Sequence, residues 1–347
     1  MISLLRFFYW LALLGLVSLQ ATALLGSHIY AFDAINHFQP FLLLVSVLSL
    51  IIAILLFGKH IFRPFHTLLL GFPFVVSSVM VLPHLASHWL QASTPIATSE
   101  AGSPLKVISF NLWAGNYKQD QVVAFVREEN PDVILFQEFA ALNRRLLKAF
   151  RTDYPYQVHC AHRAHCKVGI LSRYRLTDEA IQPFSFRQGA KPKFLDRVFG
   201  EKPERPSGPI ASARLHLPGA KPVHLITAHL RWPLPGDRQR QQFHTLLGEL
   251  KNHPSERTLL TGDFNSTPWS FALGAFDKAA GLERHTKAIW TFPTPRFYEE
   301  LGGYEGIAFL PIDQIYSGSD LRLISLKRGP YVGSDHYPLI AEFAISP

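Results

Sequence analysis

The sequence predicts an α/β fold in which two packed β-sheets are flanked by helices, a four-layer sandwich, preceded by a bundle of transmembrane helices. Residues 1–93 contain three long apolar runs and only four charged side chains, which are Arg6, Asp33, Lys59 and Arg63. The chain after residue 104 contains many short strand patterns and few helical ones. This pattern favours two packed sheets with flanking helices over a simple doubly wound sheet.

Three apolar runs, at about residues 7–25, 39–57 and 67–90, are each near the length that a helix needs to cross a bilayer. They predict a membrane anchor over residues 1–93. The first run follows Arg6 and could instead be a cleaved signal peptide, which would leave two spans. A buried, soluble helical bundle is the third interpretation, and the near absence of charge disfavours it.

The few charges near these runs predict the orientation of the chain. The segment between the second and third runs carries Lys59 and Arg63, whereas the segment between the first and second carries only Asp33. Positive charge stays preferentially on the cytoplasmic side. We therefore expect a multi-pass protein of the cell (inner) membrane with its C-terminal domain outside the cytoplasm, in the periplasm of a Gram-negative bacterium.

Residues 94–104 are rich in Ala, Ser, Thr and Pro and are predicted to be a linker to a domain over residues 105–347. That domain opens with a strand pattern over 105–110 that ends at Asn111. A helix follows at about 119–129, and a second strand over 133–137 ends at Glu138. A strand, a helix and a strand in this order indicate a βαβ unit with side chains gathered at the carboxyl ends of its strands.

The remaining elements follow the same pattern. One amphipathic helix is predicted over residues 237–251. Further strands are predicted over residues 167–171, 211–217, 223–228, 258–261, 312–316 and 339–344.

Polar residues stand at the ends of these predicted strands. Asp263 and Asn265 lie two residues apart after a buried strand, so their side chains point the same way. A carboxylate can deprotonate a water, and an amide can donate to a developing oxyanion. Asp and Asn after a Gly are also ordinary turn residues, so this pair alone decides little.

Six strings in order make the domain resemble the endonuclease/exonuclease/phosphatase superfamily over about residues 105–345. The superfamily includes deoxyribonuclease-like nucleases, inositol-phosphate phosphatases and neutral sphingomyelinases. The strings are the first strand with Asn111, Leu-Phe-Gln-Glu138, Thr-Ala-His229-Leu, Gly-Asp263-Phe-Asn265, Ile-Asp313-Gln-Ile and Ser-Asp335-His336.

The resemblance implies an essential divalent ion bound by Glu138, with Asn111 and Asp335 beside it. Oxygen ligands of this hard type suit Mg²⁺ or Mn²⁺. Arg173 falls where relatives place a phosphate-contacting Arg, and a surface Arg is an equal alternative.

The resemblance also implies the catalytic roles. Asp263 matches the residue that activates the attacking water, and Asn265 the residue that stabilises the transition state. His336, held by Asp313, either helps to activate water or donates to a phosphate oxygen. His229 matches a second His near the scissile phosphate.

Cys160 and Cys166 are the two cysteines of the chain, and His159, His162 and His165 lie among them. Zinc ligation is one interpretation, although zinc sites usually draw on two separated ligand pairs. Outside the cytoplasm a Cys160–Cys166 disulfide is favoured, with free thiols as the intermediate alternative.

We therefore expect a membrane-anchored, divalent-metal-dependent phosphoester hydrolase, nuclease-like and acting as a phosphodiesterase. The alternatives are a phosphomonoesterase or phospholipase acting on lipid or sugar phosphates, and a non-catalytic membrane scaffold. The chain after residue 93 has a net charge of +6, which fits an anionic partner. It does not distinguish a nucleic acid from a phospholipid or inositol-type head group.

Overall fold

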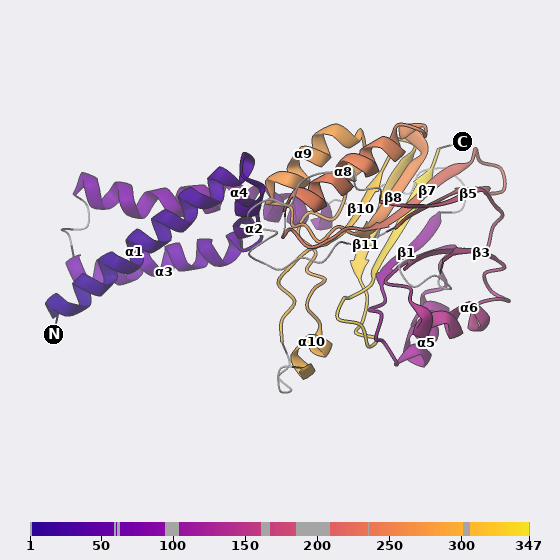
Figure 1. Cartoon of the computed structure of the whole chain (residues 1–347), viewed down its shortest axis with the longest axis horizontal. Helices are drawn as coiled ribbons and strands as arrows, with labels where there is room; N and C mark the ends of the chain where they lie inside the picture. The colour runs from indigo at the N-terminus through magenta and orange to yellow at the C-terminus, as the bar shows by residue number, and fades with distance from the viewer. Residues whose placement is uncertain are drawn as a thin grey trace, which may run out of the picture.

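The computed structural model consists of a helical bundle at one end and a sheet-containing domain at the other (Figure 1). The structure describes residues 2–58, 60, 63–93, 104–160, 167–184, 209–234, 236–300 and 306–346.

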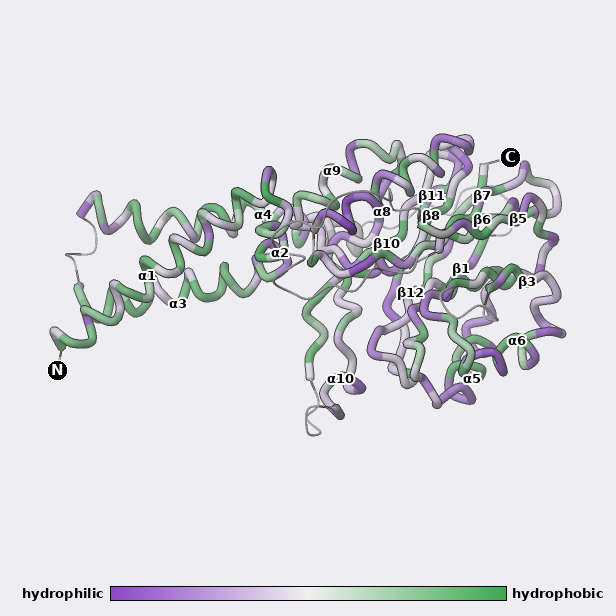
Figure 2. Tube along the Cα trace, in the orientation of Figure 1, coloured by the Kyte–Doolittle hydropathy of each residue, from purple (hydrophilic) through white to green (hydrophobic). Residues whose placement is uncertain are grey.

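The bundle contains three helices that are long and apolar enough to cross a membrane. They are α1 (Ile2–Leu24), α3 (Gln39–Phe57) and α4 (Pro64–Ser93). Figure 2 shows their predominantly hydrophobic colouring. The short helices η1 (Leu25–Ser27) and α2 (Tyr30–Asn36) join α1 to α3 on the side of the bundle that faces the domain.

Three buried polar side chains link the helices of the bundle to one another. Gln20 Nε2 donates to Ser77 Oγ at 2.6 Å and to Gln39 Oε1 at 3.0 Å, and Ser77 Oγ donates to Gln39 Oε1 at 2.9 Å. One residue comes from each of α1, α3 and α4. In an apolar bundle such bonds fix which faces of the helices meet.

The first sheet has the strand order β11-β12-β1-β2-β4-β3. β1 and β2 are parallel, and α5 (Gln119–Glu129) connects them as predicted. The other neighbouring strands are antiparallel. The strands are β1 (Leu105–Asn111), β2 (Val133–Gln137), β3 (Tyr156–His159), β4 (Val168–Ser172), β11 (Leu321–Arg328) and β12 (Leu339–Ile345).

The second sheet has the strand order β5-β6-β7-β8-β10-β9. β7 and β8 are parallel and are connected by α8 (Gly236–Leu250). The strands are β5 (Leu176–Pro183), β6 (Pro209–Leu215), β7 (Val223–His229), β8 (Thr258–Asp263), β9 (Glu283–Arg284) and β10 (Asp313–Ser317). The short η4 (Ser255–Arg257) precedes β8.

The strand alternation builds three apolar layers. Val107 of β1 and Leu259 of β8 belong to the core between the sheets, whereas Ile108 belongs to a second cluster that α5 covers. A third cluster lies between the second sheet and helices α8 and α9 (Phe271–Ala280). The short helices η3 (Ala141–Arg144), α6 (Arg145–Ala149) and α10 (Pro295–Glu300) lie in connecting segments. The arrangement of helix, sheet, sheet and helix confirms the predicted fold class.

Candidate active site

Five polar residues stand at the strand ends that meet along one edge of the two sheets. Asn111 ends β1 and Glu138 directly follows β2, its parallel neighbour. His229 of β7 is paired with Asp263 of β8 in parallel register, and Asp313 of β10 is paired with Asp263 in antiparallel register. The topology thus brings together side chains that are up to 202 residues apart in the chain.

One oxygen of the Asp263 carboxylate is surrounded by nitrogen atoms. Its Oδ2 lies 2.8 Å from Asn111 Nδ2, 3.4 Å from Asn265 Nδ2, 3.5 Å from His229 Nε2 and 3.6 Å from His336 Nε2. The side chain is only 1% exposed. Burial raises the pKa of Asp263 to about 6, even though His336 acts in the opposite direction.

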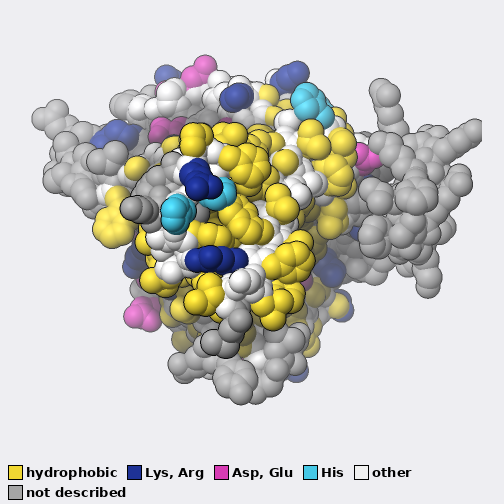
Figure 3. Space-filling model, turned by 90° about the vertical axis from the view of Figure 1, so that its left-hand side faces the viewer, with side chains coloured by type: hydrophobic (Ala, Val, Ile, Leu, Met, Phe, Trp, Pro, Cys, Tyr) yellow, Lys and Arg dark blue, Asp and Glu magenta, His cyan; other side chains and the backbone are white. Residues whose placement is uncertain are grey.

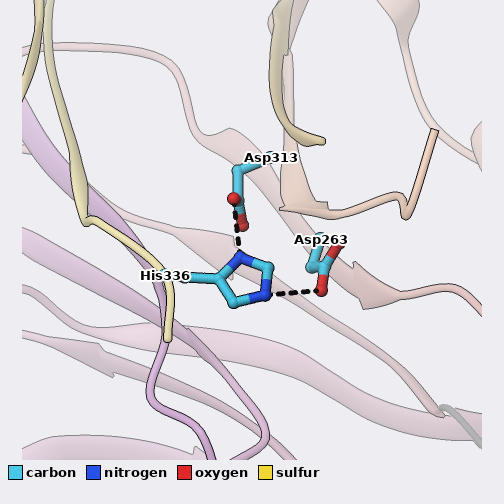
Figure 4. Close-up of side chains that lie close together, drawn as sticks. All are labelled: Asp263, Asp313 and His336. Atoms are coloured by element: carbon cyan, nitrogen blue, oxygen red, sulfur yellow. Dashed lines mark hydrogen bonds and ion pairs between the residues drawn. The ribbon is translucent and has the colours of Figure 1, made fainter. Parts of the chain in front are cut away.

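His336 is held between two carboxylates (Figure 4). Its Nδ1 lies 2.8 Å from Asp313 Oδ2, and its Nε2 faces Asp263. Burial alone would lower the pKa of His336, but the Asp313 and Asp263 carboxylates raise it to about 10. The imidazole is therefore a cation at neutral pH, and the Phe292 ring packs against it at a centroid distance of 5.0 Å.

The backbone around the site adopts sparsely populated conformations. Glu138 and Asn265 have positive φ angles of 50° and 48°. Asn tolerates this region, but a Glu does so only at a cost that the surrounding structure must offset. Gly262 has a φ of 150°, and a Cβ there would lie 1.9 Å from the carbonyl oxygen of Ala228. Only glycine therefore permits this close approach of β8 to β7.

Glu138 lies close enough to Asp335 for its charge to affect the pKa of Asp335, and Asn111, whose Oδ1 accepts the Trp113 N–H, ends the neighbouring strand β1. Burial opposes ionisation of Glu138, but His229 and the Ala114 N–H, which donates to Glu138 Oε2 at 2.9 Å, leave its pKa lowered. Burial raises the pKa of Asp335, and the Glu138 carboxylate raises it further. Two neighbouring carboxylates and a carboxamide are donors that suit a hard divalent cation.

The ligand atoms of Asp263, Asp313 and His336 also lie within 4.8 Å of one another. Both imidazole nitrogens of His336 already face carboxylates: Nδ1 is hydrogen-bonded to Asp313, and Nε2 is ion-paired with Asp263 at 3.6 Å. We term this arrangement the relay.

The structure brings eight of the residues identified from the sequence into one cluster and does not bring Arg173 there. Arg173 follows β4 and pairs by its backbone N–H with the carbonyl of Asp132, which precedes β2. Its guanidinium stacks on Tyr154 at 5.2 Å and bonds to Asn130. Since Glu138 follows the other end of β2, Arg173 lies at the opposite end of the sheet.

Cys160 is buried and disulfide-bonded. Cys166 lies outside the described residues, so the Cys160–Cys166 pairing stays a prediction.

The sequence reasoning missed the supporting role of Ser334. Ser334 Oγ donates to the carbonyl of Asn111 at 2.7 Å and accepts from the His336 N–H at 3.1 Å. It thereby fixes the loop that carries Asp335 to the end of β1. Ser334 is next to Asp335 in the sequence, but its role could not be predicted from that position. The hydrogen bond that defines this role joins residues 223 positions apart.

The family model described as "Endonuclease/Exonuclease/phosphatase family" matches residues 108–336 of the chain. None of the curated proteins matches this chain at a significant level.

Solved structures share the fold. TDP2 from D. rerio, complexed with a single-stranded DNA product, has a TM-score of 0.53 and 16% identity; the match covers 70% of this chain and 99% of that one. An endonuclease/exonuclease/phosphatase from Beutenbergia cavernae has a TM-score of 0.51 and 16% identity, covering 71% and 72%. Beta toxin from Staphylococcus aureus has a TM-score of 0.50 and 18% identity, covering 68% and 99%. At these identities the likeness shows the fold alone.

Proposed function

This chain belongs to the endonuclease/exonuclease/phosphatase family of phosphoester hydrolases, and we propose that it is a membrane-anchored, divalent-metal-dependent phosphodiesterase. The observation that carries this proposal is the environment of the Asp263 side chain. One oxygen of this buried carboxylate has four side-chain nitrogen atoms within 3.6 Å. A non-catalytic scaffold would not need to place a buried carboxylate beside a second buried acid and a cationic imidazole.

In the proposed reaction a water oxygen attacks phosphorus and one ester P–O bond breaks. Asp263 accepts the proton of that water, and its raised pKa makes it a stronger base than an exposed carboxylate. The His336 cation, oriented by Asp313, donates a hydrogen bond to a phosphate oxygen. Asn265 and His229 add donors on the same side of Asp263. The leaving alkoxide takes its proton from solvent.

Glu138, Asp335 and Asn111 would hold Mg²⁺ or Mn²⁺. Such an ion supplies Lewis-acid neutralisation of charge on a phosphate oxygen. In support, burial raises the pKa of Asp335 and the Glu138 carboxylate adds to this effect, so a cation would relieve the repulsion between the two carboxylates.

We place the domain on the periplasmic side of the inner membrane. In support, α2 with Asp33 contacts the domain, whereas Arg63 lies in the segment between α3 and α4, at the other end of the bundle. Arg6 lies at that same end, since its guanidinium donates to the carbonyl of Leu56 at 2.7 Å. Basic residues at the far end predict that this end is cytoplasmic. A reporter that is active only in the periplasm, fused after Pro347, should therefore be active, and activity of a cytoplasm-only reporter would reverse the orientation.

The test of the enzymatic proposal uses the full-length chain in detergent with bis-p-nitrophenyl phosphate. We expect hydrolysis that Mg²⁺ supports and EDTA abolishes, and a loss of about 10²-fold or more for Asp263→Asn. Asp178→Asn is the matched control, because that carboxylate is exposed and pairs with Arg214 at the surface. Equal rates for wild type and Asp263→Asn would show that the site is assigned wrongly.

A further inference from the structure

The segment between the first two spans is built into the catalytic domain. Asp33 of α2 accepts the N–H of Phe271 at 2.9 Å through Oδ1 and the N–H of Ala272 at 2.8 Å through Oδ2. These are the first two amides of α9. A buried carboxylate on the N-terminus of a helix is a favourable, directional contact. Asn36 supports it by donating to Asp33 Oδ1 at 2.8 Å.

The same segment holds the loop that carries Asn265. The His37 Nδ1 accepts the N–H of Thr267 at 3.2 Å and lies 3.0 Å from its hydroxyl. Trp269 Nε1 donates to the His37 carbonyl at 3.1 Å. His37 is two residues before α3, and Thr267 is two residues after Asn265. The contacts of Asp33 and His37 with residues 267–272, here termed the junction, therefore fix the active site next to the start of the second span.

A chain of aromatic contacts, which we term the apolar rim, connects the active site to the start of the second span. The Phe292 ring, which packs on His336, also contacts the Trp232 ring at 5.9 Å. Phe292 pairs by its backbone with Phe309, and the Phe309 ring contacts Phe41 in the first turn of α3 at 5.3 Å. Contacts thus run without a break from a catalytic histidine to a membrane span.

Three side chains of this rim project into solvent although they are apolar. Trp232 is 54% exposed, Leu234 is 57% exposed and Ile307 is 84% exposed. The rim comprises Phe292, Phe309 and these three residues. It adjoins the bundle at two points: the Phe309 ring contacts Phe41 of α3, and Pro233, between Trp232 and Leu234, lines a pocket with Gly26 and Tyr30. Figure 1 shows that the segment carrying α10 extends away from the domain, roughly perpendicular to the long axis of the molecule. It leaves the domain near the place where the bundle meets it. Figure 3 looks along the molecule from the free end of the bundle, where hydrophobic side chains predominate and acidic ones appear only near the margin.

We propose that the active site takes its substrate from the surface of the bilayer that anchors the chain, and that this substrate is a phospholipid whose head-group phosphodiester enters the site while the apolar rim contacts the lipid. The proposal rests on the phosphodiesterase function proposed above. Exposed Trp and aliphatic side chains at the level where spans end are favourable at a membrane–water interface and unfavourable in water. The junction makes this contact permanent, since it prevents the domain from turning its active site away from the bilayer.

In the reaction, water adds to the lipid phosphorus, one of its two ester P–O bonds breaks, and Asp263 receives the proton of the water. The products are a phosphomonoester and an alcohol, one of which remains in the bilayer. A soluble diester enters the same site without needing the rim, so the two substrates separate the chemistry from the membrane contact.

The experiment compares two substrates for the full-length protein reconstituted with Mg²⁺. One is phosphatidylethanolamine and phosphatidylglycerol in the vesicles themselves, and the other is soluble bis-p-nitrophenyl phosphate. We expect both to be cleaved. Leu234→Ser combined with Ile307→Ser should lower lipid turnover by about 10²-fold and leave the soluble reaction unchanged, because each side chain buried in lipid contributes about tenfold. Tyr156→Ser, an exposed aromatic on β3 at the opposite end of the first sheet, should change neither rate.

Three outcomes overturn the inference. The first is cleavage of the soluble diester without cleavage of either phospholipid. The second is lipid cleavage that the Leu234/Ile307 variant does not reduce. The third comes from a parallel assay of the same preparation with single-stranded DNA and RNA: hydrolysis of either in preference to lipid. If wild type cleaves no phosphodiester at all, the phosphodiesterase proposal itself fails, and the soluble substrate distinguishes that case from the first.

Discussion

Replacing Asp33 by Ala tests whether the junction holds the catalytic domain against the apolar helices of the bundle. The substitution removes both acceptors of the Phe271 and Ala272 N–H groups, at 2.9 and 2.8 Å. It leaves the Ser270 side-chain cap of α9, which accepts the Leu273 N–H, intact. The effect should therefore be local to the junction and should not unfold α9.

The magnitude follows from the two hydrogen bonds. A hydrogen bond to a charged acceptor contributes about 1.5–3 kcal/mol. Two such bonds correspond to about 3–6 kcal/mol, and the lower figure applies if water reaches the amides once the junction opens. A loss of about 3 kcal/mol raises the population of the open junction by about 10²-fold.

Hydrogen exchange of the full-length protein in nanodiscs measures that population. We expect the Phe271 and Ala272 amides to exchange about 10²-fold faster in Asp33→Ala. The ratio of lipid to soluble-diester turnover should fall in the same variant. The control is Asp120→Ala, which removes an exposed carboxylate from the first turn of α5 and should cost only about 0.3–1 kcal/mol. Unchanged protection of both amides in Asp33→Ala would refute the reasoning.

Three further predictions concern pH, packing and the relay. Burial lowers the pKa of His37 from its ordinary 6.5 to about 4, so between these pH values the unfolded chain binds a proton that the folded chain does not. Thermal unfolding should therefore show that the contribution of His37 to the free energy of unfolding is fully present above pH 6.5 and about 3 kcal/mol lower at pH 4. His37→Gln should flatten this pH dependence. Gly262→Ala should destabilise the domain by more than about 2 kcal/mol in denaturant unfolding, because its Cβ would overlap the Ala228 carbonyl; a midpoint within error of wild type would contradict this. Asp313→Asn should lower kcat about 10²-fold with little change in KM, because His336 loses the carboxylate that favours its cation; an unchanged kcat would remove the relay from the mechanism.

The strand ends that form the site could be predicted from the sequence because local patterns define them. The helix at 119–129 and the strand at 133–137 have the predicted bounds, and Asn111 and Glu138 follow from these elements. The family resemblance then supplied their roles. Arg173 was assigned from a sequence position alone, and its strand runs antiparallel to β2, which carries it to the wrong end of the sheet.

The elements that were missed depend on distant partners or on weak local signals. The seven-residue α2 has no periodicity that distinguishes it from a loop, and its Asp33 bonds to residues 238 and 239 positions away. Helix α9 has a recognisable Ser270 cap and a terminal Gly281, so its start and stop signals were present. The strand β11 also alternates apolar and polar residues, and it could have been found by that pattern.

The polar contact among Gln20, Gln39 and Ser77 has a consequence for how the chain matures. If the first helix were removed by proteolysis, Gln39 and Ser77 would lose the amide that bonds to both, at about 1 kcal/mol for each bond between helices. Ala23 would also no longer offer its carbonyl to Asn36, the residue that supports Asp33. A peptidase that cut behind the first helix would therefore loosen the attachment of the catalytic domain as well as the bundle.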